Sequence, residues 1–157
     1  FIKLGDFGLS RLVNQRNLTP QMVTIWYRCP ELLLNETYYS IGIDIYSIAL
    51  CIIEFMTGVP LLRGENEINQ LKLIKDNLGD ITYDHLQDEN IHSIKRFENK
   101  RFLIVNEIIS NRYKNEDVII LNELSDLLSR MLSWNPNIRP SSHDALNHPY
   151  FQNSQIN

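Results

Sequence analysis

The sequence predicts a mainly α-helical domain with one short strand at its start, on three observations. Apolar residues recur at helical spacing over residues 43–57, 66–78 and 122–133. Strand-like alternation marks residues 1–4, which stop at a turn cluster with two glycines at residues 5–8. The composition, 43% hydrophobic and 22% charged, is that of a globular protein. A length of 157 residues therefore allows one domain, or part of one.

Charge and cysteine content exclude several classes of protein. With 15 Lys+Arg against 19 Asp+Glu the chain is mildly acidic and its cations are scattered, so nucleic-acid binding is not expected. Cys29 and Cys51 lack the spacing of a disulfide framework or a zinc site, which favours an intracellular location, in nucleus or cytoplasm. The most apolar stretch, residues 41–56, is shorter than a bilayer span and carries two acids, so no membrane segment is expected.

The helical stretches differ in their expected surroundings. Residues 43–57 are apolar nearly all round and predict a helix buried on every side, ended by Gly58. Residues 66–78 predict an amphipathic surface helix that ends at Gly79. Between residues 80 and 117 the pattern predicts only some helix.

The two ends of the chain carry weaker signals. Residues 9–29 have no sustained period, and Pro20 and Pro30 interrupt the chain there, which is typical of a functional or disordered loop. Ser141 and Asp144 form a capping-box pattern that predicts a last short helix, ended by Pro149. The chain starts without Met, so we expect that a longer protein precedes it.

Four separated motifs occur in one order along the chain: LGDFGLSR at residues 4–11, VTIWYRCPE at 23–31, DIYS at 44–47 and NPNIRP at 135–140. Together they resemble the C-terminal lobe of a eukaryotic protein kinase, from the DFG motif to the end of the domain. The WYR run, with GENEINQL at residues 64–71, is most similar to the cyclin-dependent kinases. The chain departs from that pattern at Cys29, at Tyr46 in place of a tryptophan, and in residues 80–117.

The resemblance assigns the DFG motif to metal and nucleotide chemistry. It implies that Asp6 binds the Mg²⁺ that accompanies ATP, while Phe7 packs to position Asp6 and Gly8 acts as a hinge. The plainer alternative for Asp6 is a residue that caps a turn. Thr24 matches the threonine that contacts the catalytic aspartate, so Asp6 and Thr24 are the candidate catalytic residues.

The loop between the first two motifs resembles an activation segment. Thr19 lies where cyclin-dependent kinases carry an activating phosphothreonine, and Arg11 matches one of the phosphate's arginine partners. A plain turn residue beside a proline is the alternative for Thr19. Val23 and Arg28 match the pair that shapes the pocket for the residue after the phosphoacceptor; a surface arginine is the alternative there.

Three further matches are structural. Glu31 and Arg139 correspond to the family's buried ion pair, which ties the activation segment to the helical base. Asp44 matches an aspartate that hydrogen-bonds the catalytic loop, or is an acid stabilised at a helix N-terminus.

The resemblance therefore predicts a partial kinase domain over residues 1–151 and a short tail over 152–157. Its parent would use ATP and Mg²⁺ to phosphorylate protein substrates at Ser or Thr followed by Pro, with a cyclin-type activating subunit. The Gly-rich loop, strand lysine and catalytic loop of a kinase do not occur in this sequence, so this chain alone is expected to be inactive. A mitogen-activated-type kinase, and a non-catalytic pseudokinase or truncated interaction module, remain the alternatives.

Overall fold

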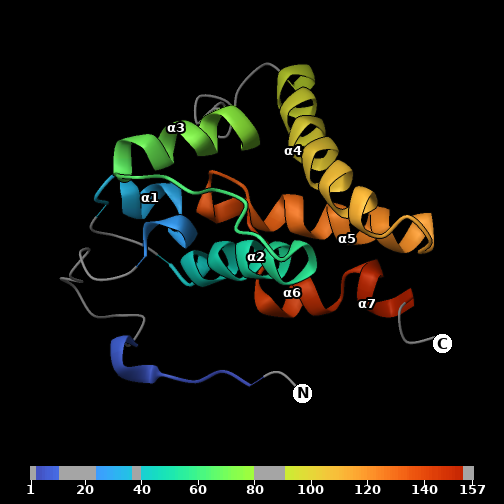
Figure 1. Ribbon diagram of the computed structural model, residues 1–157, viewed down its shortest axis with the longest axis horizontal. Helices are drawn as coiled ribbons and strands as arrows, with labels where there is room; N and C mark the ends of the chain where they lie inside the picture. The colour runs from blue at the N-terminus through green and yellow to red at the C-terminus, as the bar shows by residue number, and fades with distance from the viewer. Residues whose placement is uncertain (1–2, 11–23, 37–39, 80–90, 154–157) are drawn as a thin grey trace.

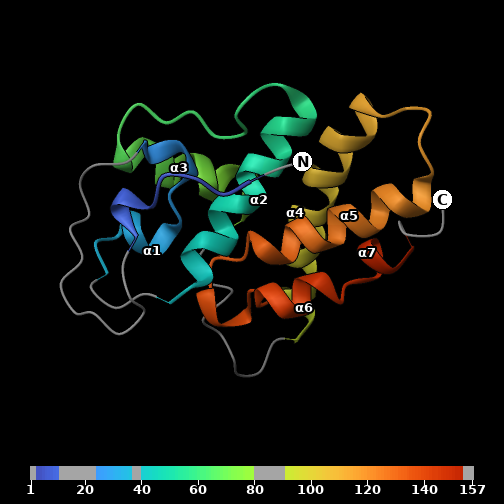
Figure 2. The ribbon, with the colours of Figure 1, turned by 90° about the horizontal axis from the view of Figure 1, so that it is seen from below.

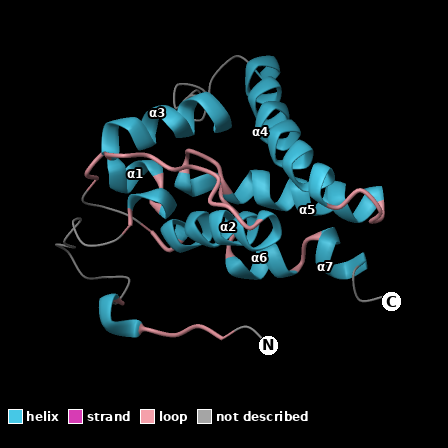
Figure 3. Ribbon diagram, viewed as in Figure 1, coloured by secondary structure: helices cyan, strands magenta, loops and turns pink. Residues whose placement is uncertain are grey.

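The protein is described here by a computed structural model that covers residues 3–10, 24–36, 40–79 and 91–153. Within these ranges the chain is helical and contains no strand (Figures 1 and 3). The longer helices are α2 (Gly42–Thr57), α3 (Glu67–Leu78), α4 (Ile91–Arg112) and α5 (Val118–Met131). The shorter elements are η1 (Phe7–Leu9), η2 (Ile25–Tyr27), α1 (Pro30–Leu33), η4 (Pro136–Ile138), α6 (Ser142–Leu146) and α7 (Pro149–Asn153). The predicted mainly helical architecture is therefore correct.

Helix α2 lies in the middle of the helical body, with α3 and α4 on one side and α6 and α7 on the other (Figure 1). It packs against α4, α5, η2 and η4, and its buried face includes Tyr46, Leu50 and Ile53. The helix ends where expected, because Gly58 adopts a left-handed φ of 79° and donates its N–H to the Glu54 carbonyl at 2.7 Å. No helix in the described ranges combines the length and hydrophobicity needed to cross a membrane.

The expectation that α2 is buried on every side is wrong. Ile48 is 41% exposed and Phe55, two turns further on, is 74% exposed. Residues seven apart share one helical face, so these side chains mark an apolar stripe in contact with water. Burying such surface would stabilise the protein by about 25 cal/mol per Å².

Helix α3 follows the predicted boundaries closely. The Asn66 side chain caps its start by accepting the Asn69 N–H at 2.9 Å, and Gly79 follows its last residue. Ile74 and Leu78 are buried while Ile68 is exposed, as an amphipathic surface helix requires. This helix positions the candidate site described below.

Helices α4 and α5 form the most extensively packed helix pair. Helix α5 starts four residues before the predicted position 122, because the Asp117 side chain accepts the Ile119 N–H at 2.8 Å and caps the helix there. Between the helices, Asn106 donates to the Asn122 side-chain oxygen at 2.7 Å. This exposed hydrogen bond links the two helices at one position.

The C-terminal capping box forms as predicted, but the role expected of Pro149 is wrong. Ser141 and Asp144 exchange side-chain-to-backbone hydrogen bonds at 3.1 Å in both directions. Helix α6 already ends at Leu146, and Pro149 is the first residue of α7. Proline suits that position because its missing N–H would have no helical partner in a first turn.

The short N-terminal strand is not found where the chain is described. Lys3 and Leu4 form a loop, and residues 1–2 lie outside the described part. A strand depends on backbone hydrogen bonds to a neighbouring strand, and alternation in the sequence does not supply that neighbour.

The exposed stripe on α2 predicts that the chain associates with itself. We expect concentration-dependent association in sedimentation velocity, and Phe55→Ser should weaken it while changing the free energy of unfolding by no more than about 0.5 kcal/mol. Leu103→Ser, at an exposed position on α4, serves as the control because it lies on another helix. Association that is equally strong in Phe55→Ser would contradict this role of the stripe.

Candidate functional site

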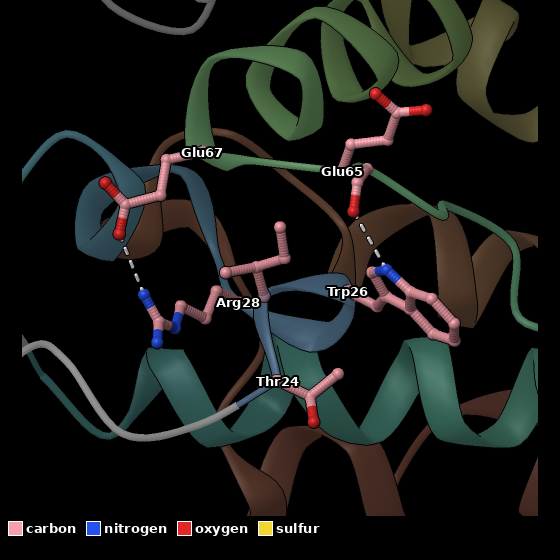
Figure 4. A pocket seen from close by; sticks show the side chains of 7 residues that line it. Thr24, Trp26, Arg28, Glu65 and Glu67 are labelled. Atoms are coloured by element: carbon pink, nitrogen blue, oxygen red, sulfur yellow. Dashed lines mark hydrogen bonds and ion pairs between the residues drawn. The ribbon is translucent and has the colours of Figure 1, made fainter.

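A groove lies between the segment that leads into α1 and the start of α3 (Figure 4). It has a volume of about 670 Å³ and is widely open to solvent. Its lining combines one arginine and two glutamates with a tryptophan, an isoleucine, a threonine and a glycine. The lining residues are Thr24, Ile25, Trp26, Arg28, Gly64, Glu65 and Glu67.

A closed set of hydrogen bonds joins the two walls of the groove. The Trp26 indole N–H donates to the Gly64 carbonyl at 3.0 Å, and the Gly64 N–H donates to Gln70 Oε1 at 2.7 Å. Gln70 Nε2 then donates to the Trp26 carbonyl at 3.0 Å. A Cβ atom on Gly64 would lie 2.7 Å from the Gln70 Cα, so only glycine allows this approach. The walls are therefore held at a defined separation.

Arg28 is held by an acidic residue of α3. Its Nη1 donates to Glu67 Oε1 at 3.0 Å, with 9% of the arginine side chain and 44% of the glutamate side chain exposed (Figure 4). Arg28 is thus not the surface arginine that was the plain alternative. The motif GENEINQL contains Glu67 and Gln70, but no sequence signal assigned a contact to either residue.

Thr24 also lines this groove. It precedes η2 and makes no side-chain capping hydrogen bond there. Its side chain is exposed. The hydroxyl is therefore accessible to a group outside the described chain.

Tyr27 points away from the groove toward α2. Its hydroxyl donates to Glu54 Oε2 at 2.5 Å, and this bond to a carboxylate, together with partial burial, raises the pKa of Tyr27 from 10.0 to about 12. The Ser47 hydroxyl donates to the Tyr27 carbonyl at 2.9 Å. Two side chains of α2 thus hold the residue next to Arg28.

Below this segment Glu31 and Arg139 form a buried bidentate ion pair. Nη1 and Nη2 of Arg139 donate to the two carboxylate oxygens of Glu31 at 2.6 and 2.8 Å. The remaining donors of the guanidinium bind backbone carbonyls of Ser133, Gly42 and Trp134 at 2.8–3.1 Å. All five N–H donors of an arginine are therefore used, which is what a buried guanidinium requires.

Two buried residues pack around this ion pair. The ring of Tyr46 lies 5.0 Å from Arg139 Cζ, so the residue that replaces the family's tryptophan still supplies an aromatic face. The Tyr46 hydroxyl is buried with no hydrogen-bond partner among the described residues. Burial, and secondarily the Glu31 carboxylate, raises the pKa of the Cys29 thiol to about 12, so this free cysteine stays protonated.

The turn formed by Asp6, Phe7 and Gly8 is closed by a side-chain hydrogen bond of Asp6. Asp6 itself takes the left-handed conformation, with φ 58°, and its Oδ1 accepts the Gly8 N–H at 3.3 Å. Gly8 does not have a positive φ; a Cβ there would lie 3.2 Å from Asp6 Oδ1. Element η1 lies apart from the helical body, and the Phe7 ring in it is 68% exposed (Figures 1 and 2).

The donor set around Asp6 fits only part of a metal site. Across the described residues, no group of three or more His, Cys, Asp or Glu side chains is placed to hold a metal ion. Mg²⁺, however, takes only one or two protein carboxylates and fills its shell with water and phosphate oxygens. The exposed Asp6 carboxylate can serve as one such ligand.

The remaining predicted site residues divide into two groups. Asp44 lies in the first turn of α2 with an exposed side chain, where it also complements the helix dipole. Arg11, Thr19 and Val23 lie outside the described residues. The structure therefore gathers Thr24 and Arg28 in one groove, pairs Glu31 with Arg139 below it, and places Asp6 apart.

The sequence matches the family model described as "Protein kinase domain" over residues 1–151. The chain belongs to this family.

The relatives include a cyclin-dependent kinase, a mitogen-activated protein kinase and a further serine/threonine-protein kinase. Cyclin-dependent kinase 7 of Dictyostelium discoideum is 38% identical over 152 residues, which cover 96% of this chain and 40% of the relative. Mitogen-activated protein kinase 10 of Arabidopsis thaliana is 33% identical over 150 residues, 95% of this chain and 37% of the relative. Serine/threonine-protein kinase ppk23 of Schizosaccharomyces pombe is 38% identical over 157 residues, 98% of this chain and 38% of the relative. The chain thus spans about two fifths of the length of these relatives.

Breaking the buried ion pair should strongly destabilise the chain. Glu31→Gln leaves the Arg139 guanidinium buried without its counter-charge, and we expect a loss of about 3–5 kcal/mol in the free energy of unfolding. Urea denaturation followed by circular dichroism measures it. Glu36→Gln, which removes an exposed carboxylate just after α1, is the matched control and should change stability by less than about 0.5 kcal/mol. If both variants unfold at the same urea concentration, the ion pair does not stabilise the fold.

The Tyr27–Glu54 bond should make stability fall in alkali. The folded-state pKa of about 12 lies above the ordinary 10.0, so the contribution is complete below pH 10 and is lost as the pH rises through 12. NMR titration of ring-¹³C-labelled tyrosine should assign the high pKa to the signal missing in Tyr27→Phe. In Glu54→Ala the same signal should titrate closer to pH 10; an unchanged titration would rule out the carboxylate as the cause.

Proposed function

We propose that this chain is the substrate-binding part of a serine/threonine protein kinase that phosphorylates Ser or Thr followed by Pro. The family match supports a protein kinase, and one relative carries serine/threonine kinase in its name. Residues 1–151 would form the partial kinase domain, followed by a short tail over 152–157. Because the relatives are longer than this chain, the activity is proposed for the protein that contains it.

The groove around Arg28 is the observation that carries this proposal. The family resemblance implies that the Arg28 guanidinium draws the backbone carbonyl of Val23 toward itself. An incoming peptide N–H after the phosphoacceptor would then find no acceptor, at a cost of about 1–3 kcal/mol. Proline has no N–H and avoids that cost, which makes the groove selective for it.

Asp6 is the residue proposed to hold Mg²⁺ with ATP. The metal ion would supply charge stabilisation on the phosphate oxygens during transfer. Asp6 would contribute one carboxylate oxygen, and its left-handed backbone directs the side chain toward the Gly8 N–H. The phosphate-binding loop, the strand lysine and the catalytic loop would come from elsewhere in the parent protein, so this chain alone would not transfer phosphate.

Regulation of the parent would follow the cyclin-dependent kinases. Phosphorylation of Thr19 would add nearly two negative charges close to Arg11, and a cyclin-type subunit would be the activating partner. The second candidate is a mitogen-activated-type kinase, which the relative from Arabidopsis thaliana favours. That group carries Thr-x-Tyr in this loop, whereas no tyrosine occurs between Gly8 and Trp26 in this sequence.

Proline selectivity is the direct test. The full-length protein with its activating partner should phosphorylate a Ser-Pro peptide with a kcat/KM at least about tenfold above that of the matched Ser-Ala peptide, the equivalent of about 1.4 kcal/mol. Arg28→Ala should reduce this ratio toward one. Equal rates on both peptides in the wild-type protein would refute the proposed selectivity, and absence of phosphorylation on either would favour a non-catalytic module.

A further inference from the structure

Two side chains on one face of α3 hold the segment that carries Arg28. Glu67 and Gln70 are three residues apart, so they project from the same side of the helix. Glu67 binds the Arg28 guanidinium at 3.0 Å, and Gln70 binds the Trp26 carbonyl at the same distance. The start of α3 therefore contacts this segment at both a side chain and the backbone.

We propose that Glu67 is a positioning residue that determines selectivity at this groove by fixing the orientation of Arg28. The proposal rests on the proline-directed activity proposed above. It assigns the selectivity to a pair of residues on two separate elements, one on the segment before α1 and one on α3. Glu67 itself would touch neither the reacting atoms nor the phosphoacceptor.

The electrostatics of the pair support this assignment. The Arg28 side chain is 9% exposed and carries a full charge, so the carboxylate of Glu67 at 3.0 Å is one of the groups that set its orientation. Removing the Glu67 charge would let the guanidinium turn toward water or toward Glu65, which lines the same groove. The Val23 carbonyl, which the family resemblance pairs with Arg28, would then be free to accept a peptide N–H. Alanine after the phosphoacceptor would therefore be tolerated.

The first experiment compares Glu67→Ala with the wild-type, full-length protein on the matched Ser-Pro and Ser-Ala peptides. The ratio of kcat/KM values should fall about fivefold, as expected for the loss of a half-exposed ion pair of about 1 kcal/mol. Glu67→Gln, which keeps an acceptor oxygen, should show a smaller loss. Asp76→Asn removes an exposed carboxylate from the last turn of the same helix and should leave the ratio unchanged.

The second experiment tests positioning without a substrate. The Arg28 backbone N–H donates to the Ile25 carbonyl at 3.1 Å, so its hydrogen exchange reports on the order of this segment. Hydrogen exchange of the Arg28 N–H should accelerate about fivefold in Glu67→Ala, which corresponds to the same loss of about 1 kcal/mol. It should remain unchanged in Asp76→Asn. The thermal midpoint of each variant identifies any general loss of structure.

The outcomes separate the two proposals. A wild-type protein without proline preference refutes the proposed selectivity, and the role of Glu67 falls with it. A wild-type preference that survives in Glu67→Ala overturns only the role of Glu67. A reduced ratio with unchanged exchange at Arg28 also overturns it, because Glu67 would then act on the peptide directly.

Discussion

The rest of the structure depends on one buried guanidinium. Arg139 binds both oxygens of Glu31 in α1 and the Gly42 carbonyl at the start of α2, while its own neighbours Ser133 and Trp134 supply two more carbonyl acceptors. A charge buried this deeply persists only when every donor is used, so the three chain segments must meet at one point. The ion pair therefore fixes where α1 and α2 begin relative to the C-terminal helices.

The geometry of the groove depends on the Glu31–Arg139 ion pair. The segment 24–28 leads directly into α1, and Ser47 and Glu54 of α2 bind Tyr27 from below. The start of α3 closes the other wall through Gln70 and Glu67. A change at the ion pair would thus affect the groove through α1 and α2, whereas a change at the start of α3 would affect the groove directly through Arg28 and Trp26. The buried ion pair of Arg139 is thus separate from Arg28, the residue to which we assign the proposed recognition of proline.

Local chemistry in the sequence determined the helix boundaries well where a cap or a break was present. Gly58 ends α2, Asn66 starts α3, and the Ser141–Asp144 box starts α6, since each acts on backbone groups within a few residues. Four spaced motifs were also enough to recognise the family, and through it to pair Glu31 with Arg139. Pro149 shows the limit of such signals, because the same residue ends one helix or begins the next.

Only the tertiary structure decided which faces and partners these elements have. The apolar pattern of α2 could not tell that Phe55 remains exposed, because exposure depends on which other segments cover the helix. Nor could alternation at residues 1–4 guarantee a strand, which requires a partner. Glu67 and Gln70 lie about 40 residues from Arg28 and Trp26, so their contacts arise from helix packing. Sequence determines what is local to the backbone; long-range contacts follow from how the elements pack.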